Sequence, residues 1–207
     1  RNEMADIYLE TARKYEHSAI FLHPNPNTAD ETLRLIDLVR EKSGDAYFLM
    51  LHGDPTYSIP SGSDMMEQAA WFYERMDDAK AEADRRVDEQ LAWCERLNAH
   101  GGLDGFALCS DYCFNDNPFL RPDLFAILIT PYLKRVIAGM RAMGFYVIKH
   151  TDGNILPILD QLVDANPHAL HSLDPQGGVD IAEVKRQYGE RVCLIGNVNC
   201  GLLTSGT

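Results

Sequence analysis

Six short apolar runs divide the chain, and each is followed at once by polar side chains. Their length, and the Gly, Pro, Asn and Asp residues around them, are typical of buried β-strands bounded by turns. We therefore predict six strands, at 19–22, 46–51, 106–109, 146–149, 169–170 and 192–195.

The segments between these runs carry apolar residues at helical spacing. Thr28 or Asp30 is expected to cap a helix that ends near residue 42. The charge-dense stretch 63–99 contains neither Pro nor Gly, so it predicts one or two helices with a solvated face. Further helices are expected at 2–16, after 131, near 155–165 and at 180–188, and a loop is expected at 204–207.

Strands that alternate with helices indicate a parallel sheet wrapped by helices. No GxGxxG or Walker loop follows any predicted strand, which disfavours a nucleotide-binding sheet and favours a closed barrel. Such a barrel needs eight strands and typically ~250 residues. We therefore expect an α/β fold, a (β/α)8 TIM barrel in one incomplete domain over residues 1–207, with about two strands outside this chain. Arg1 is not a natural start, which agrees with this expectation.

Composition narrows the functional classes. The net charge of −12 argues against a nucleic-acid-binding surface. No apolar stretch approaches the ~20 residues of a membrane span, and no signal peptide is recognisable, so we expect a cytoplasmic protein. The five cysteines form no CxxC pair and are expected to be free thiols. Cys109 and Cys193 should lie in the core, whereas Cys200 is the thiol expected at the ends of the strands.

The polar residues at the strand ends carry the functional argument, because the carboxyl ends of barrel strands meet at one mouth where catalytic groups lie. Asp and Asn are also common there as turn residues, but turn chemistry does not select histidine. Four of the seven histidines follow predicted strands, which favours a functional mouth. The residues that follow the six runs are His23, His52, Asp54, Asp111, His150, Asp152, His171, Asp174, Asn197, Asn199 and Cys200.

The second half of the chain resembles the uroporphyrinogen-decarboxylase superfamily. The resemblance rests on Ile-Lys-His-Thr-Asp-Gly-Asn at 148–154, Leu-His-Ser-Leu-Asp-Pro at 170–175 and Leu-Ile-Gly-Asn-Val at 194–198. Cys-Ser-Asp-Tyr at 109–112 also looks familial. The resemblance implies a single distorted TIM barrel whose first and last strands lie outside this chain.

Two chemistries occur in this superfamily. Its decarboxylases carry an Arg-Gln-Ala-Gly-Arg segment that this sequence lacks, and His23-Pro24-Asn25 stands where they have an aspartate. Its corrinoid-linked methyltransferases hold zinc through a His-x-Cys pair and a later Cys. Here His150-Thr151-Asp152 retains the histidine and replaces the cysteine with a carboxylate, which can also bind zinc.

The resemblance therefore implies methyl transfer between a small methylated substrate and a corrinoid protein, with zinc at His150 and Asp152. Two residues apart on an extended segment, these side chains share one face. The third ligand is left open between His52, Asp111 and His171. The alternative is that Asp152 caps the next helix while His150 bonds a backbone carbonyl.

The remaining assignments follow from the polar residues at the strand ends and from the resemblance. Asp111, His171 and Asn197 are the catalytic candidates, with Asp111 and His171 placed to position or protonate a leaving group. A corrinoid protein is the expected partner, and a homodimer stays open. Decarboxylation of uroporphyrinogen III is the alternative activity, and a degenerate barrel without activity is a third. The substrate-binding candidates are His52, Asp54, Asn154 and Asn199.

Overall fold

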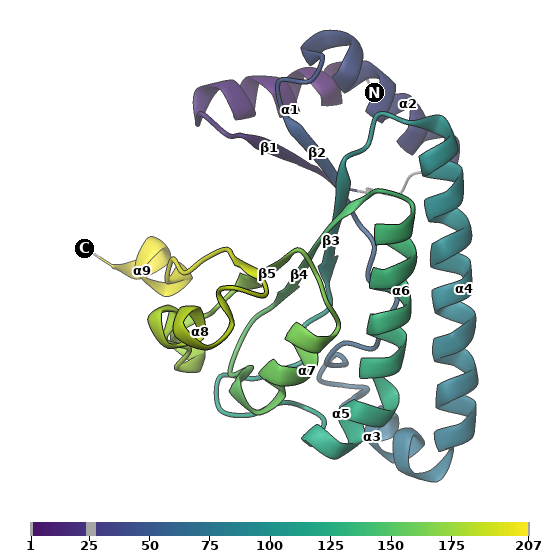
Figure 1. The fold of residues 1–207 in the computed structure, drawn as a ribbon, viewed down its shortest axis with the longest axis vertical. Helices are drawn as coiled ribbons and strands as arrows, with labels where there is room; N and C mark the ends of the chain where they lie inside the picture. Colours follow the sequence, from purple (N-terminus) through teal and green to yellow (C-terminus); the bar gives the residue numbers. More distant parts are fainter. Residues whose placement is uncertain (1, 24–27, 207) are drawn as a thin grey trace.

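Six parallel strands form one curved sheet in which the strands follow each other in chain order (Figure 1). The computed structural model describes residues 2–23 and 28–206. All six predicted strands are confirmed, and their ends shift by only a few residues. The strands are β1 (Ala19–Leu22), β2 (Phe48–His52), β3 (Gly105–Cys109), β4 (Tyr146–Thr151), β5 (Ala169–Ser172) and β6 (Cys193–Leu194).

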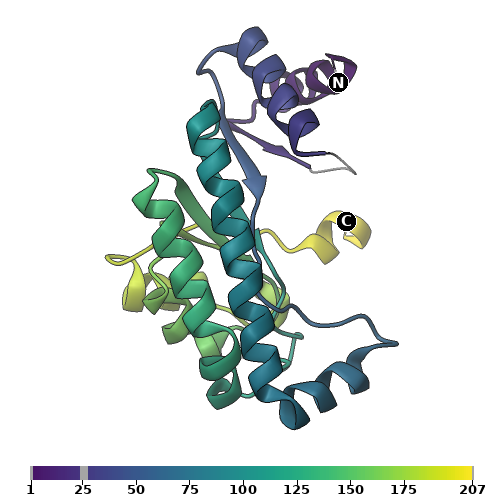
Figure 2. The ribbon, with the colours of Figure 1, turned by 90° about the vertical axis from the view of Figure 1, so that its right-hand side faces the viewer.

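Helices connect every pair of consecutive strands, and the two longest of the central part, α4 and α6, lie side by side on the outer face of the sheet (Figures 1 and 2). The 63–99 stretch forms two helices that meet at Arg75. The helices are α1 (Asn2–Lys14), α2 (Ala29–Ser43), α3 (Met65–Glu74), α4 (Met76–His100), α5 (Pro122–Leu128), α6 (Thr130–Ala142), the short η1 (Leu156–Ile158), α7 (Leu159–Asp164), the short η2 (Pro175–Gly177), α8 (Ile181–Tyr188) and α9 (Cys200–Ser205).

The alternation of side chains along each strand separates two faces of the sheet. Leu49 and Leu51 of β2 are buried, whereas Phe48, Met50 and His52 on the other face are only half-buried. The buried set belongs to one hydrophobic core that also contains the apolar side of α6. The outer face therefore holds the helices in place, and the inner face is the one that can carry a site.

Local signals explain where several helices begin. Thr28 is the residue that caps α2: its hydroxyl accepts from the Glu31 N–H, and the Glu31 carboxylate accepts from the Thr28 N–H at 3.1 Å, which is a capping box. Two short helices, α5 and α9, were not predicted. Helix α9 is only six residues long, starts from a side-chain cap at Asn199 and includes residues 204 and 205 of the expected loop.

Strands β1 and β6 do not pair with each other within residues 2–23 and 28–206. The parallel α/β architecture is confirmed, while the closed eight-stranded barrel stays a prediction. Cys193 was expected in the core, but its side chain is exposed, because β6 has a neighbour on one side only. In the described part of the chain no helix combines the length and apolarity that crossing a membrane requires.

Candidate metal centre and adjoining cavity

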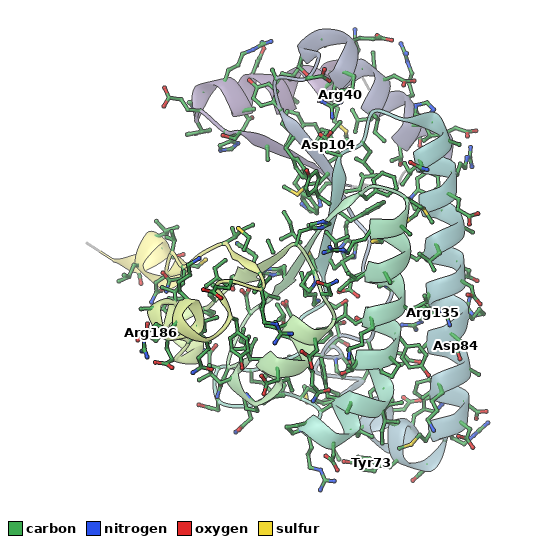
Figure 3. All side chains as sticks on the ribbon, viewed as in Figure 1. Arg40, Tyr73, Asp84, Asp104, Arg135 and Arg186 are labelled. Carbon is green, nitrogen blue, oxygen red and sulfur yellow. The ribbon has the colours of Figure 1, made fainter. Side chains whose placement is uncertain are left out.

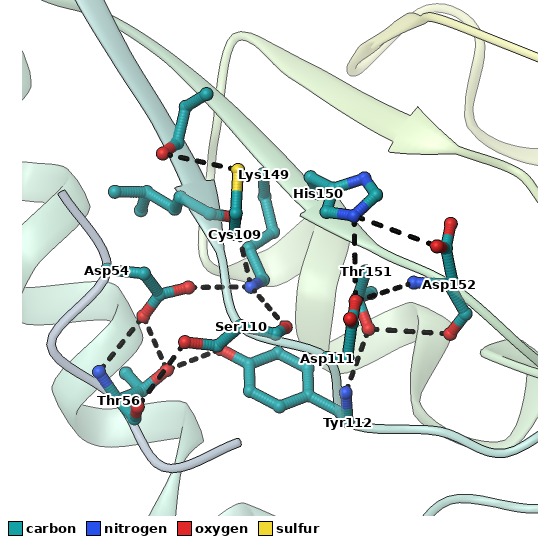
Figure 4. Close-up of polar contacts among 12 residues, drawn as sticks. Asp54, Thr56, Cys109, Ser110, Asp111, Tyr112, Lys149, His150, Thr151 and Asp152 are labelled. Atoms are coloured by element: carbon teal, nitrogen blue, oxygen red, sulfur yellow. Dashed lines mark hydrogen bonds and ion pairs between the residues drawn. The ribbon is translucent and has the colours of Figure 1, made fainter. Parts of the chain in front are cut away.

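Three side chains able to bind a metal meet at the carboxyl ends of β3 and β4 (Figure 4). Asp111 follows β3, His150 lies in β4 and Asp152 follows β4. One ligand atom from each lies within 4.8 Å of the other two. His150 Nε2 is 3.5 Å from Asp111 Oδ1 and 3.9 Å from Asp152 Oδ2. Ligands about 2.0–2.1 Å from a tetrahedral zinc lie roughly 3.3 Å apart, so small side-chain movements would suffice to hold the ion.

The pairing of the strands produces this arrangement. Cys109 pairs with His150 across β3 and β4, and His150 pairs with His171 across β4 and β5. The two-residue spacing turns His150 and Asp152 toward the same side, as the sequence predicted. Of the three residues left open as the third ligand, Asp111 is the one in this cluster.

Hydrogen bonds orient the two carboxylates. The Ser172 hydroxyl donates to Asp152 Oδ1, so that Oδ2 faces His150. The Asp152 N–H donates to Asp111 Oδ1 at 3.1 Å. Among the residues that the structure describes, no helix N–H donates to Asp152, and the Leu156 N–H at the next helical turn donates to Asn154 instead. The capping alternative for Asp152 therefore does not describe this structure.

The two imidazoles of the site are in direct contact. His150 Nδ1 lies 2.7 Å from His171 Nδ1, so one nitrogen must carry the proton and the other must accept it. Burial lowers the pKa of His171 below its usual value, and the neighbouring His150 lowers it further. A neutral His171 can accept from His150 Nδ1–H, which leaves the lone pair of His150 Nε2 facing the carboxylates. This is the tautomer that a metal ligand needs.

A cavity of about 330 Å³ adjoins the histidine pair on the inner face of the sheet. Its volume lies in the range of small-molecule sites. Burial raises the pKa of Cys109 to about 11, so this lining thiol is neutral at pH 7. None of the described lining residues is Asp, Glu, Lys or Arg. The cavity is lined by Phe21, Met50, Ala107, Cys109, Ile148, His150, His171 and Ile195.

Three of the other predicted site residues have local structural contacts. Asn154 accepts from the Leu156 N–H and donates to the Asp116 carbonyl at 2.8 Å, which shapes the loop after β4. The Asn199 side chain caps α9. The Asp54 carboxylate is fully buried and offers no exposed oxygen to a substrate.

Two more stand apart from the cluster. His52 shares the inner face of β2 with Met50, and its buried Nδ1 has no hydrogen-bond partner within residues 2–23 and 28–206. Asn197 is half-buried beyond β6, and no hydrogen bond in the described part of the chain joins its side chain to the three ligands. Their predicted roles stay predictions. Cys200, expected near the strand ends, is exposed at the start of α9.

Sequence reasoning missed a buried polar network behind the site. Lys149 and Asp54 form an ion pair at 2.6 Å, and both side chains are 0% exposed. Burial alone would raise the pKa of Asp54, but the Lys149 charge and hydrogen bonds from Lys149 and Thr56 outweigh it and lower that pKa. Burial lowers the pKa of Lys149, and Asp54 opposes this. The available signal was Lys149 at the end of the apolar run 146–149.

Comparisons with known proteins concern the fold and the family of the chain. The chain resembles a methyltransferase from Methanosarcina mazei with a TM-score of 0.75 at 18% sequence identity, over 96% of this chain and 70% of that one. That likeness concerns the fold. No curated protein matches the sequence. The family model for uroporphyrinogen decarboxylase (URO-D) matches residues 56–207, well over half of the sequence, and the chain therefore belongs to the URO-D family.

Proposed function

We propose that this protein transfers a methyl group between a small methylated substrate and a corrinoid protein, using zinc held by His150, Asp152 and Asp111. The observation that carries the proposal is the three-ligand cluster at the mouth of the parallel strands, directly beside a neutral, mainly apolar cavity. The structural likeness to a methyltransferase supports the choice within the URO-D family.

Each group of residues in the site would have its own role in methyl transfer. Bound zinc would supply Lewis-acid chemistry at the reacting atom. The apolar lining would hold the methyl-bearing body of the substrate and exclude water. With His150 Nδ1–H as the donor, His171 would accept at Nδ1 and carry its proton on Nε2, from where it could donate to a leaving atom in the cavity. Asp111 and Asp152 place negative charge around His150.

Decarboxylation of uroporphyrinogen III is the alternative. A tetrapyrrole with several carboxylates needs cationic side chains in its site, and the described lining supplies none. Arg121 is the arginine that precedes α5. It is exposed and paired with Asp123 at 2.7 Å near the start of α5, so it is not part of the cavity lining. The cavity thus favours a neutral substrate.

The test compares His150→Ala with the wild-type whole protein. Because loss of an outer hydrogen-bond partner costs about 10–100-fold in zinc affinity, loss of the ligand should cost more. Zinc affinity is measured by competition with a chromophoric chelator, and methyl transfer is measured with a corrinoid protein. His17→Ala, an exposed histidine near α1, is the control and should bind zinc like wild type. Unchanged zinc binding and activity in His150→Ala, together with turnover of uroporphyrinogen III, would favour the decarboxylase.

A further inference from the structure

The Lys149–Asp54 pair lies on the outer face of the sheet, directly behind the candidate metal centre. We propose that Lys149 is a positioning residue: together with Asp54 it fixes the carboxyl ends of β2, β3 and β4, and thereby sets the separation of Asp111 and His150. The inference rests on the proposed function, because it concerns how well that centre holds a metal.

Each donor of the Lys149 ammonium has an acceptor. Its Nζ lies 2.6 Å from Asp54 Oδ2, 3.2 Å from the Leu108 carbonyl oxygen and 2.9 Å from the Ser110 carbonyl oxygen. An ammonium has three N–H donors, so all of them are used. The same atom lies 4.1 Å from the centre of the Tyr112 ring. The Lys149 side chain of β4 therefore donates to two carbonyls at the end of β3 and to Asp54 in the segment after β2.

Alternation along the chain connects this network to the site, as Figure 4 shows with Lys149 and His150 on opposite sides of β4. Lys149 and Thr151 flank His150. Ser110 and Tyr112 flank Asp111 in the same way, and the Tyr112 N–H donates to Thr151 Oγ1 at 3.0 Å. The outward neighbours of both ligands are thus tied to each other, so a shift of one loop moves the ligand that it carries.

The Asp54 side completes the network. Asp54 Oδ1 accepts from the Thr56 N–H at 2.9 Å and from its hydroxyl at 2.5 Å. Thr56 Oγ1 lies 2.6 Å from the Tyr112 hydroxyl. A fully satisfied buried network is rigid, because each group would lose a partner if it moved.

Stability alone is a weak reason for burying this ion pair. Replacing a buried pair by apolar residues of similar volume is often neutral or stabilising, since desolvation offsets much of the attraction. Neither Lys149 nor Asp54 has an exposed side-chain atom, so neither touches a substrate. A role that works through Asp111 and His150 is consistent with both observations.

The experiment replaces both charges at once, in the double variant Asp54→Asn/Lys149→Met. The single variant Lys149→Met would leave a buried carboxylate unpaired and could unfold the protein. We expect the folded double variant to bind Zn²⁺ and Co²⁺ about 10–100-fold more weakly than wild type, the loss typical of residues that orient metal ligands. We also expect its bound Co²⁺ to give a different visible absorption spectrum, which a loss of stability alone would not produce.

The matched control is Arg40→Met/Asp104→Asn. It removes a partly buried ion pair, at 2.6 Å, from the opposite end of the sheet, where Figure 3 shows both residues near the start of the strands. This variant should lose stability and keep the Co²⁺ affinity and spectrum of wild type. An equal loss of metal affinity in the control would overturn the positioning role.

A second variant tests the same inference if the double variant does not fold. Thr151→Val removes the acceptor of the Tyr112 N–H and keeps the ion pair, and it should change the Co²⁺ spectrum and weaken binding. Wild-type affinity and spectrum in a folded Thr151→Val or double variant would overturn the inference alone. A wild-type protein that binds neither ion would overturn the proposed function and this inference with it.

Discussion

Single side chains decide how the carboxylates of the candidate centre face a metal. Ser172 lies one strand away from Asp152 and holds one of its two oxygens. Its hydroxyl is too far along the chain to be assigned from spacing, because the pairing of β4 with β5 brings it there. Without this hydrogen bond the Asp152 carboxylate could rotate about its terminal torsion. The entropy lost in ordering it would then weaken metal binding.

Ser172→Ala should therefore weaken zinc binding by about 10-fold while His150→Ala weakens it more. Chelator competition on the folded variants measures both. Ser63→Ala is the control, because that hydroxyl bonds Asp64 in the exposed segment before α3. Equal zinc affinity in wild type and Ser172→Ala would mean that this hydrogen bond does not orient the ligand.

For single residues, the sequence predicts contacts between near neighbours in the chain but not contacts between distant positions. The spacing of His150 and Asp152 was enough to place both on one face, because alternation is a local rule. The partner of Lys149 was not predictable in the same way, since Asp54 is 95 positions away. Asp54 was assigned to substrate because it follows a strand, but only the fold could show that its side chain is buried behind the sheet.

At the scale of elements, periodic patterns and caps predicted most of the structure, and short elements without them were missed. The strands were found because each is an apolar run bounded by turn residues. Helix α9 has six residues and no buried side chain, so it carries no hydrophobic period. Helix α2 was predicted because its apolar residues recur at helical spacing and a capping residue precedes them.

The capping box of α2 gives a prediction about stability. Thr28→Ala should lower the free energy of unfolding by about 1 kcal/mol, because the Glu31 N–H loses its acceptor at the helix start. Urea unfolding followed by circular dichroism measures the change. In Thr11→Ala the same replacement is made on the exposed side of α1, and there it should be neutral or slightly stabilising. Equal effects at both positions would show that the cap contributes nothing.

For the whole molecule, the alternation of strands and helices predicted a parallel sheet in chain order, because each crossover returns the chain to the same edge. The same order places the carboxyl ends of β2 to β5 side by side, and this is why residues far apart in sequence meet at the candidate centre. What the alternation could not specify is which of the converging residues face inward as ligands and which become buried supports.

The buried pair also links the stability of the whole molecule to pH. The pKa of Asp54 in the folded protein lies below its ordinary value of 3.8, so folding favours its ionised form. This contribution to stability is fully present above the ordinary pKa and is lost as the pH falls through the lower, folded value. The pKa of Lys149 is also lowered, so its effect on stability changes only as the pH rises through that lower folded value toward the ordinary value of 10.5.

We therefore expect the wild-type protein to lose stability below about pH 4 more steeply than Asp54→Asn/Lys149→Met, which lacks the titrating carboxylate. Urea unfolding of both proteins at several pH values between 7 and 3 measures this. Other carboxylates titrate equally in the two proteins, so the difference between their unfolding free energies isolates Asp54. That difference should be constant from pH 7 to 5 and should shift against wild type as the pH falls further. A difference that is independent of pH down to 3 would mean that Asp54 has the same pKa in the folded and the unfolded protein, so that its charge does not stabilise the fold.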